Sequence, residues 1–306
     1  IKPTFLFLFL IIISFFSFLY TGIKIDSFSF SNILVSQFYI KMDKKLILTI
    51  DNIEYKSEKT TTSSSFEELK DSIELLPKVL NFFQKIKINK LKINDNEFEI
   101  ILDDEILYLD NKYINIASKI DTISNQVVFE LYSLYLKDLN FLFDGKVKID
   151  YFNEKIDYYG NFYYENLQSN INVEMTKKIA KFYLVSEPFK SLKFLKNFLH
   201  LPNIAESWMY DNVKGDIKIE ELYAEYDLIN NHIIENSIQG KAQIKDAKIR
   251  FHKDVDAVNT KSLDIFFKDN RLHFNLMEPM FKDKKLDGSF VLINNLTSEK
   301  NGQVDV

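Results

Sequence analysis

The chain has 306 residues, a formal net charge of −5 and no cysteine. The near-balanced charge excludes the basic surface that nucleic-acid binding requires. The missing thiols exclude disulfides, thiol catalysis and zinc–thiolate sites. Because 46% of the residues are hydrophobic, the chain has enough apolar material for one large or two ordinary domains.

The first element is an uncharged apolar stretch, FLFLFLIIISFFSFLYTGI, at residues 5–23. As a helix its 19 residues would be about 28 Å long, close to the roughly 30 Å core of a bilayer. No small-residue cleavage site follows it, which favours a retained anchor over the alternative of a cleaved signal peptide. We therefore predict a membrane anchor over residues 1–23, with Lys2 favouring an inside N-terminus and the rest of the chain outside.

After the anchor, apolar and polar residues alternate with the period of two that is typical of β-strands. The pattern is clear in residues 23–30, 45–55 and 86–102. In the last of these the apolar phase changes by one residue between Ile88 and Leu91, which suits a β-bulge. Strand follows strand, so we expect a mostly antiparallel sheet and no parallel βαβ fold.

A helical insertion at about residues 63–84 interrupts the alternation. Ser65 precedes Glu68 by three positions, the spacing of a capping box. Apolar residues then recur every three or four positions, as on one face of a helix. We expect Pro77 to kink or divide this helix.

A second interruption, at residues 187–214, is predicted to be a helical joint. Pro202 is expected to open a short helix at its first turn. Ile204 and Trp208 then lie on the same side of this helix, because they are four residues apart. Gly215 is expected to end the segment, after which the alternation resumes.

The joint separates two predicted β segments, at residues 24–186 and 215–306. The clearest hairpin lies in the second segment, at residues 263–276. We expect its apolar residues to pair across Asp269 and Asn270, because both residue types tolerate the positive φ of a tight turn.

No stretch carries a recognisable catalytic or metal-binding pattern. The four histidines lie far apart in the sequence, and the common nucleophile, phosphate-loop, dinucleotide and zinc-protease motifs are missing. We therefore predict that the protein is not an enzyme and has no catalytic residue, metal site or cofactor.

The predicted sheet has one apolar face and few helices to cover it, which would be an aggregation hazard in water. Either the sheet closes into a barrel or sandwich core, or it curls into a groove that holds something apolar. The anchor favours the groove. The candidate groove-lining residues come from three alternating stretches near the C-terminus: Ala247, Ile249, Phe251, Leu272, Phe274, Leu276, Phe290 and Leu292.

Three stretches carry a family resemblance. The anchor runs directly into the alternating residues 22–55. LPNIAESWMYDNVKGDIKIEEL, at 201–222, is similar to a Leu-Pro…Trp-Leu…Gly-x-Ile pattern, with Met209 where Leu is common. Residues 241–293 contain an A-x-I-x-F strand, an L-x-F-x-L-x-x-P strand and a G-S strand in that order. In these features the chain resembles the AsmA-like superfamily and, within it, the YhdP-type proteins of Gram-negative envelopes.

The resemblance implies a mainly β fold: an elongated, curled antiparallel sheet (a taco-like β-groove) with two short helical insertions and an N-terminal transmembrane helix. It further implies a single-pass inner-membrane protein with the bulk of the chain in the periplasm, where it binds acyl-chain lipid and supports phospholipid transport toward the outer membrane. From their shared helical face, Ile204 and Trp208 are expected either to pack in the core at the joint or to plug or cover the groove there. Family members are usually longer, so a fragment is one interpretation of this chain.

An alternative function belongs to a different class: a non-enzymatic envelope scaffold or outer-membrane assembly factor. Its sheet would pack as a closed core, and its partners would be other envelope proteins. Co-purified phospholipid would favour the groove over this alternative.

Overall fold

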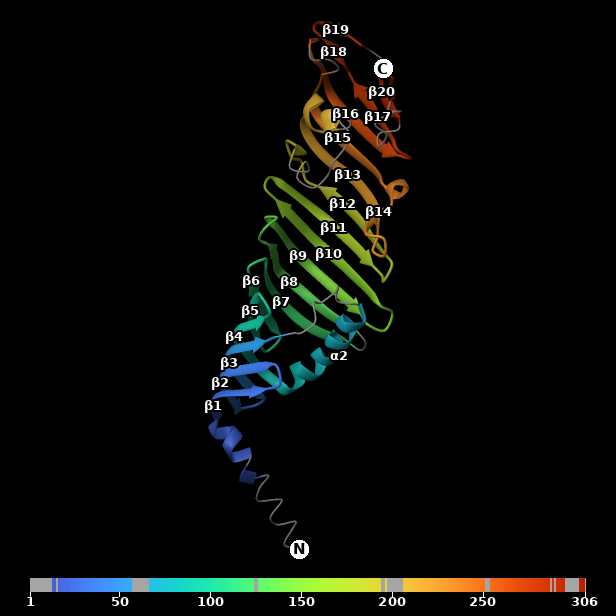
Figure 1. The fold of residues 1–306 in the computed structure, drawn as a ribbon. Helices are drawn as coiled ribbons and strands as arrows, with labels where there is room; N and C mark the ends of the chain where they lie inside the picture. The colour runs from blue at the N-terminus through green and yellow to red at the C-terminus, as the bar shows by residue number, and fades with distance from the viewer. Residues whose placement is uncertain are drawn as a thin grey trace. The chain divides into compact units, whose positions relative to one another are not determined.

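The structure is a computed structural model with two compact units, Ile1–Lys155 and Ile156–Val306 (Figure 1). The residues that it describes are 13–14, 16–56, 66–123, 126–193, 196, 206–250, 254–286, 288, 290–294 and 303–305. The predicted joint at 187–214 therefore lies inside the second unit and does not separate the two units.

The first unit is a β-sheet whose strands neighbour one another in chain order. The predicted mainly β class is confirmed. The strands are β1 (Ile23–Phe30), β2 (Ile33–Met42), β3 (Leu46–Tyr55), β4 (Phe83–Ile93), β5 (Asn96–Asp103), β6 (Ile106–Asn111), β7 (Ile114–Ile123), β8 (Gln126–Leu136) and β9 (Phe141–Asp150).

One pair of strands in this sheet is parallel, and the other pairings are antiparallel, as the sequence predicts for most of the sheet. β3 and β4 run in the same direction, and the helix α2 (Phe66–Phe82) connects them. A parallel pair needs such a crossover because the chain must return to the same end of the sheet. α2 contains Pro77 within one continuous helix, so of the two predicted effects of this proline, a kink or a division, the division does not occur. Ser65 and the start of the predicted insertion lie outside the described residues.

The predicted anchor lies largely outside the described residues, which include 13–14 and 16–23 of it. Residues 16–21 are helical, and β1 begins at Ile23. Among the residues that the structure describes, no helix has the length and apolar character needed to cross a bilayer.

The second unit is also a sheet built mainly of antiparallel neighbours in chain order. β14 lies beside β13, and β18 and β19 extend from β16 as a small side hairpin. The strands are β10 (Lys155–Tyr164), β11 (Leu167–Met175), β12 (Ile179–Ser186), β13 (Val213–Asp227), β14 (His232–Ile233), β15 (Gln239–Ile249), β16 (Val258–Lys268), β17 (Arg271–Met277), β18 (Met280–Phe281), β19 (Lys284–Lys285), β20 (Phe290–Asn294) and β21 (Gln303–Asp305). Two single turns, η2 (Ser207–Asn212) and η3 (Glu235–Ser237), flank β13 and β15.

Two local predictions are confirmed. The pairing of β4 with β5 shifts by one residue between Ile88 and Leu91, at the predicted phase change. The β16–β17 hairpin turns at Asp269 and Asn270, whose φ angles of 51° and 58° are both positive. Side-chain alternation and turn chemistry therefore set the register of these strands.

The prediction that Gly215 ends the joint is wrong, because Gly215 lies inside β13, which already starts at Val213. Its φ is +154°, and a Cβ there would lie 2.5 Å from the Cγ2 atom of Ile244. The pairing of β13 with β15 also shifts between Lys214 and Asp216. Gly215 therefore marks a β-bulge where the two strands approach closely.

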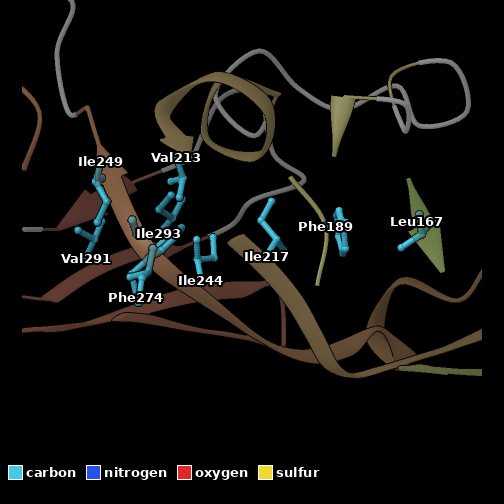
Figure 2. Close-up of a cluster of buried hydrophobic side chains, with 11 residues drawn as sticks. Leu167, Phe189, Val213, Ile217, Ile244, Ile249, Phe274, Val291 and Ile293 are labelled. Carbon is cyan, nitrogen blue, oxygen red and sulfur yellow. The ribbon is translucent and has the colours of Figure 1, made fainter. Parts of the chain in front are cut away.

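The core of the second unit is a cluster of buried apolar side chains from β11, β13, β15, β16, β17 and β20, together with Phe189. In Figure 2 these side chains form a line that Phe189 and Leu167 continue beyond Ile217. We refer to the cluster as the core of the second unit.

Candidate functional site

In the first unit, one cross-strand row contains an apolar residue from every strand. Each member is paired in register with the next, so all of them project from the same face of the sheet. The row consists of Ile25, Phe38, Ile50, Ile88, Ile100, Leu109, Ile116, Leu134 and Phe143. Nine strands at about 4.8 Å spacing give this row a length of about 38 Å.

A shorter apolar row lies on each side of it. One runs through Ile23, Ile40, Leu48, Ile86, Leu102 and Leu107. The other runs through Phe28, Val35, Ile53, Leu91 and Phe98. We call these three rows the apolar face of the first unit.

This face is partly accessible. Most members of the long row are half-buried, and at its β1 end Ile25 is 39% exposed and Phe28, in the neighbouring row, 40%. A few members, such as Ile50 at 6%, are buried. A contiguous apolar surface of this length is unusual for a soluble protein and makes this face the candidate interaction site of the first unit.

The opposite face of the same strands is polar and carries ion pairs. Lys90 lies 2.9 Å from Glu97, and Lys137 lies 2.7 Å from Asp110. The hydrogen bond from Lys137 is the main cause that lowers the pKa of Asp110, and a second bond from Asn115 adds to it. The sheet is therefore amphipathic, with one face suited to water and the other to apolar groups.

In the second unit, five of the predicted groove residues lie together on one face. Ala247, Ile249 and Phe274 are 1%, 0% and 2% exposed and belong to the core. Leu272 and Leu276 are partly buried and pack against it. The prediction therefore found the apolar face, but this part of the face is packed as a core and leaves the three buried residues no room to contact a ligand.

Phe290 and Leu292 were predicted to line the groove together with these five residues. The structure instead places both of them on the opposite face of the sheet. Leu292 is paired with His273, and the rings of Phe290 and His273 are 6.0 Å apart. The intervening residues Val291 and Ile293 point into the core. The sequence pattern could not show which of these residues face the core, because residues 290–293 are all apolar.

The three remaining predicted site residues are Phe251, Ile204 and Trp208. Phe251 and Ile204 lie outside the described residues. Trp208 lies in η2, a π-helical turn, and its side chain is not described. In the same turn Tyr210, which the sequence analysis did not single out, is 3% exposed.

The apolar face of the first unit was not among the predicted site residues. Its signal was present, because the alternating stretches at 23–30, 45–55 and 86–102 supply four of its strands. Only the register of the sheet brings these residues into continuous rows.

Residues 198–306 match the family model described as YhdP protein. The resemblance predicted from the sequence is thereby confirmed for this part of the chain. Two of the three stretches that carry it, at 201–222 and 241–293, lie within the match to the YhdP family, and the N-terminal stretch lies outside it. No curated protein and no solved structure matches the chain.

Proposed function

We propose that this chain is a membrane-anchored periplasmic protein that binds lipid acyl chains on its apolar strand faces and supports phospholipid transport between the inner and outer membranes. The observation that carries the proposal is the nine-residue apolar row of the first unit and its accessibility. The match to the YhdP family and the apolar stretch at residues 5–23 support it further.

The dimensions of the face suit this ligand. A bilayer core of about 30 Å contains two leaflets, so one acyl chain spans about 15 Å, less than half the length of the row. Each methylene that leaves water contributes about 0.8 kcal/mol. Affinity therefore comes from the area of contact with the acyl chain, and the headgroup stays in water.

The test is the mass of the purified protein. A chain that begins at Lys24 keeps nearly all of β1. It can be purified and measured by native mass spectrometry, which preserves bound lipid. Bound phospholipid, identified by extraction, is the expected result. A lipid-free mass together with a stoichiometric protein partner would contradict the proposal and favour the envelope scaffold, a function consistent with the packed core of the second unit.

A further inference from the structure

The sheet of the second unit has a break between β12 and β13. Their pairing runs from Ile179–Asp227 to Leu184–Leu222 and stops there. Beyond it the described residues continue no ladder: the Ile219 N–H donates to the Ser186 hydroxyl at 2.9 Å, and an isolated bridge joins Phe189 and Ile217 through two backbone hydrogen bonds of 2.8 Å. The main chain therefore leaves an opening where a continuous ladder would seal the sheet.

A cleft of about 540 Å³ lies at this break. It is formed by residues 190–193 after β12, by Tyr210 of η2, by residues 213–217 of β13 and by Lys245 and Asp246 of β15. We call it the joint cleft. Its volume lies within the range of about 300–1,000 Å³ that small-molecule sites occupy.

The joint cleft is apolar on one side and charged on the other. Val213 and Ile217 on its lining belong to the core of the second unit, and Leu192 packs against that core. The polar side carries four lysines and two aspartates. A molecule bound here would contact apolar and cationic groups at once, which is what an amphiphile with a negative headgroup requires.

The lysines are not all neutralised. Lys190 is paired with Asp216, and Lys193 lies 3.4 Å from Asp211. Among the described residues, Lys214 and Lys245 have no ion-pair partner. Both project from the polar face, so their charges are available at the mouth of the cleft.

A buried hydroxyl supplies an independent sign of a ligand. Tyr210 is 3% exposed, and its hydroxyl oxygen has no hydrogen-bond partner among the described residues. Burial, and to a lesser extent Glu206, raises its pKa, so the hydroxyl stays protonated and can donate. An unsatisfied buried hydroxyl is destabilising, and an acceptor atom of a ligand would remove that penalty.

We propose that the joint cleft binds the negatively charged headgroup of an acyl lipid. Tyr210 donates a hydrogen bond to a headgroup oxygen, Lys214 and Lys245 supply the charge, and the start of the acyl chain lies against Leu192, Val213 and Ile217. This inference rests on the proposed function but adds a headgroup preference, which the apolar face of the first unit does not provide.

The test compares two soluble short-chain lipids with identical chains, phosphatidylglycerol and phosphatidylcholine, on the full chain held in an amphipathic polymer. The variant Lys214→Ser/Lys245→Ser should weaken phosphatidylglycerol binding about tenfold and leave phosphatidylcholine binding nearly unchanged. A matched control is Lys261→Ser/Lys268→Ser, which removes two exposed lysines from β16 of the same unit. The control should bind both lipids as the parent does.

Tyr210→Phe separates ligand binding from packing. It removes only the buried hydroxyl, so the melting temperature should not fall. Phosphatidylglycerol binding should nevertheless weaken severalfold. Unchanged binding in both Tyr210→Phe and the lysine variant, or an equal loss in the β16 control, overturns the inference.

The remaining outcomes distinguish this inference from the proposed function. If neither lipid binds the parent chain, the proposed function fails as well. If both lipids bind equally and the variants change nothing, the proposed function stands and the headgroup site does not exist. If inorganic phosphate alone competes as strongly as phosphatidylglycerol, the cleft is a site for a free anion, and the lipid occupant is excluded.

Discussion

The sharpest test of acyl-chain binding uses two adjacent isoleucines of β5 that lie on opposite faces of the sheet. Ile100 belongs to the long apolar row, between Ile88 and Leu109. Ile101 is paired with Lys87 and Tyr108 on the opposite face. Both side chains are half-buried, so Ile100→Asp and Ile101→Asp should destabilise the sheet to a similar extent.

The expected magnitude follows from the burial. Fully burying an isoleucine side chain contributes about 1.5–3 kcal/mol, and most of that is already realised in the free protein, because Ile100 is only partly exposed. Contact with an acyl chain therefore adds at most about 1 kcal/mol at Ile100. Aspartate loses this contribution and must also give up water, so the affinity for lipid should fall about fivefold or more.

The assay is the amount of phospholipid that co-purifies with each variant, together with the rate at which each transfers a fluorescent phospholipid between vesicles. Ile100→Asp should lose most of its bound lipid, whereas Ile101→Asp should keep it. Denaturant unfolding controls for stability. Equal lipid retention by two folded variants would refute the assignment of this face as the lipid surface.

Two further predictions concern stability and protonation. Gly215→Ala should lower the free energy of unfolding by about 1–3 kcal/mol in a denaturant titration, because its φ is +154° and a Cβ would meet Ile244 at 2.5 Å; Gly288→Ala, where nothing lies within 4 Å, should cost less. Asp150 has its pKa lowered to about 2, chiefly by the backbone and side-chain hydrogen bonds of Asn153. Its contribution to stability is therefore present above about pH 3.8 and lost as the pH falls toward 2, and in a carboxyl NMR titration Asn153→Ala should raise this pKa part of the way back.

The elements that the sequence predicted well are those that local chemistry determines. The β16–β17 hairpin could be placed because Asp269 and Asn270 fix the turn and alternation fixes the faces. The bulge after Ile88 could be placed because the apolar phase changes there. Both signals lie within about fifteen residues of sequence.

The parts that escaped prediction depend on distant contacts or on missing local contrast. The parallel pairing of β3 and β4 depends on where α2 returns the chain, which alternation does not encode. Phe290 and Leu292 were given the wrong face because a run of apolar residues has no phase. Pro77 was expected to kink or divide the helix, and the structure keeps α2 as one element.

Alternation alone also cannot tell an open apolar face from a packed one, although this difference decides which residues meet a ligand. Ile100 of the first unit and Phe274 of the second occupy equivalent positions in apolar cross-strand rows. Ile100 is half-buried, whereas Phe274 is 2% exposed and belongs to a core that also includes Phe189, from the segment after β12. On our proposal, a lipid uses the first surface as it stands and reaches the second at the joint cleft, whose lining includes Val213 and Ile217. Substitutions that affect lipid binding should therefore concentrate on the first unit's face and on this cleft, while those at Ile249 or Leu263 should act through stability.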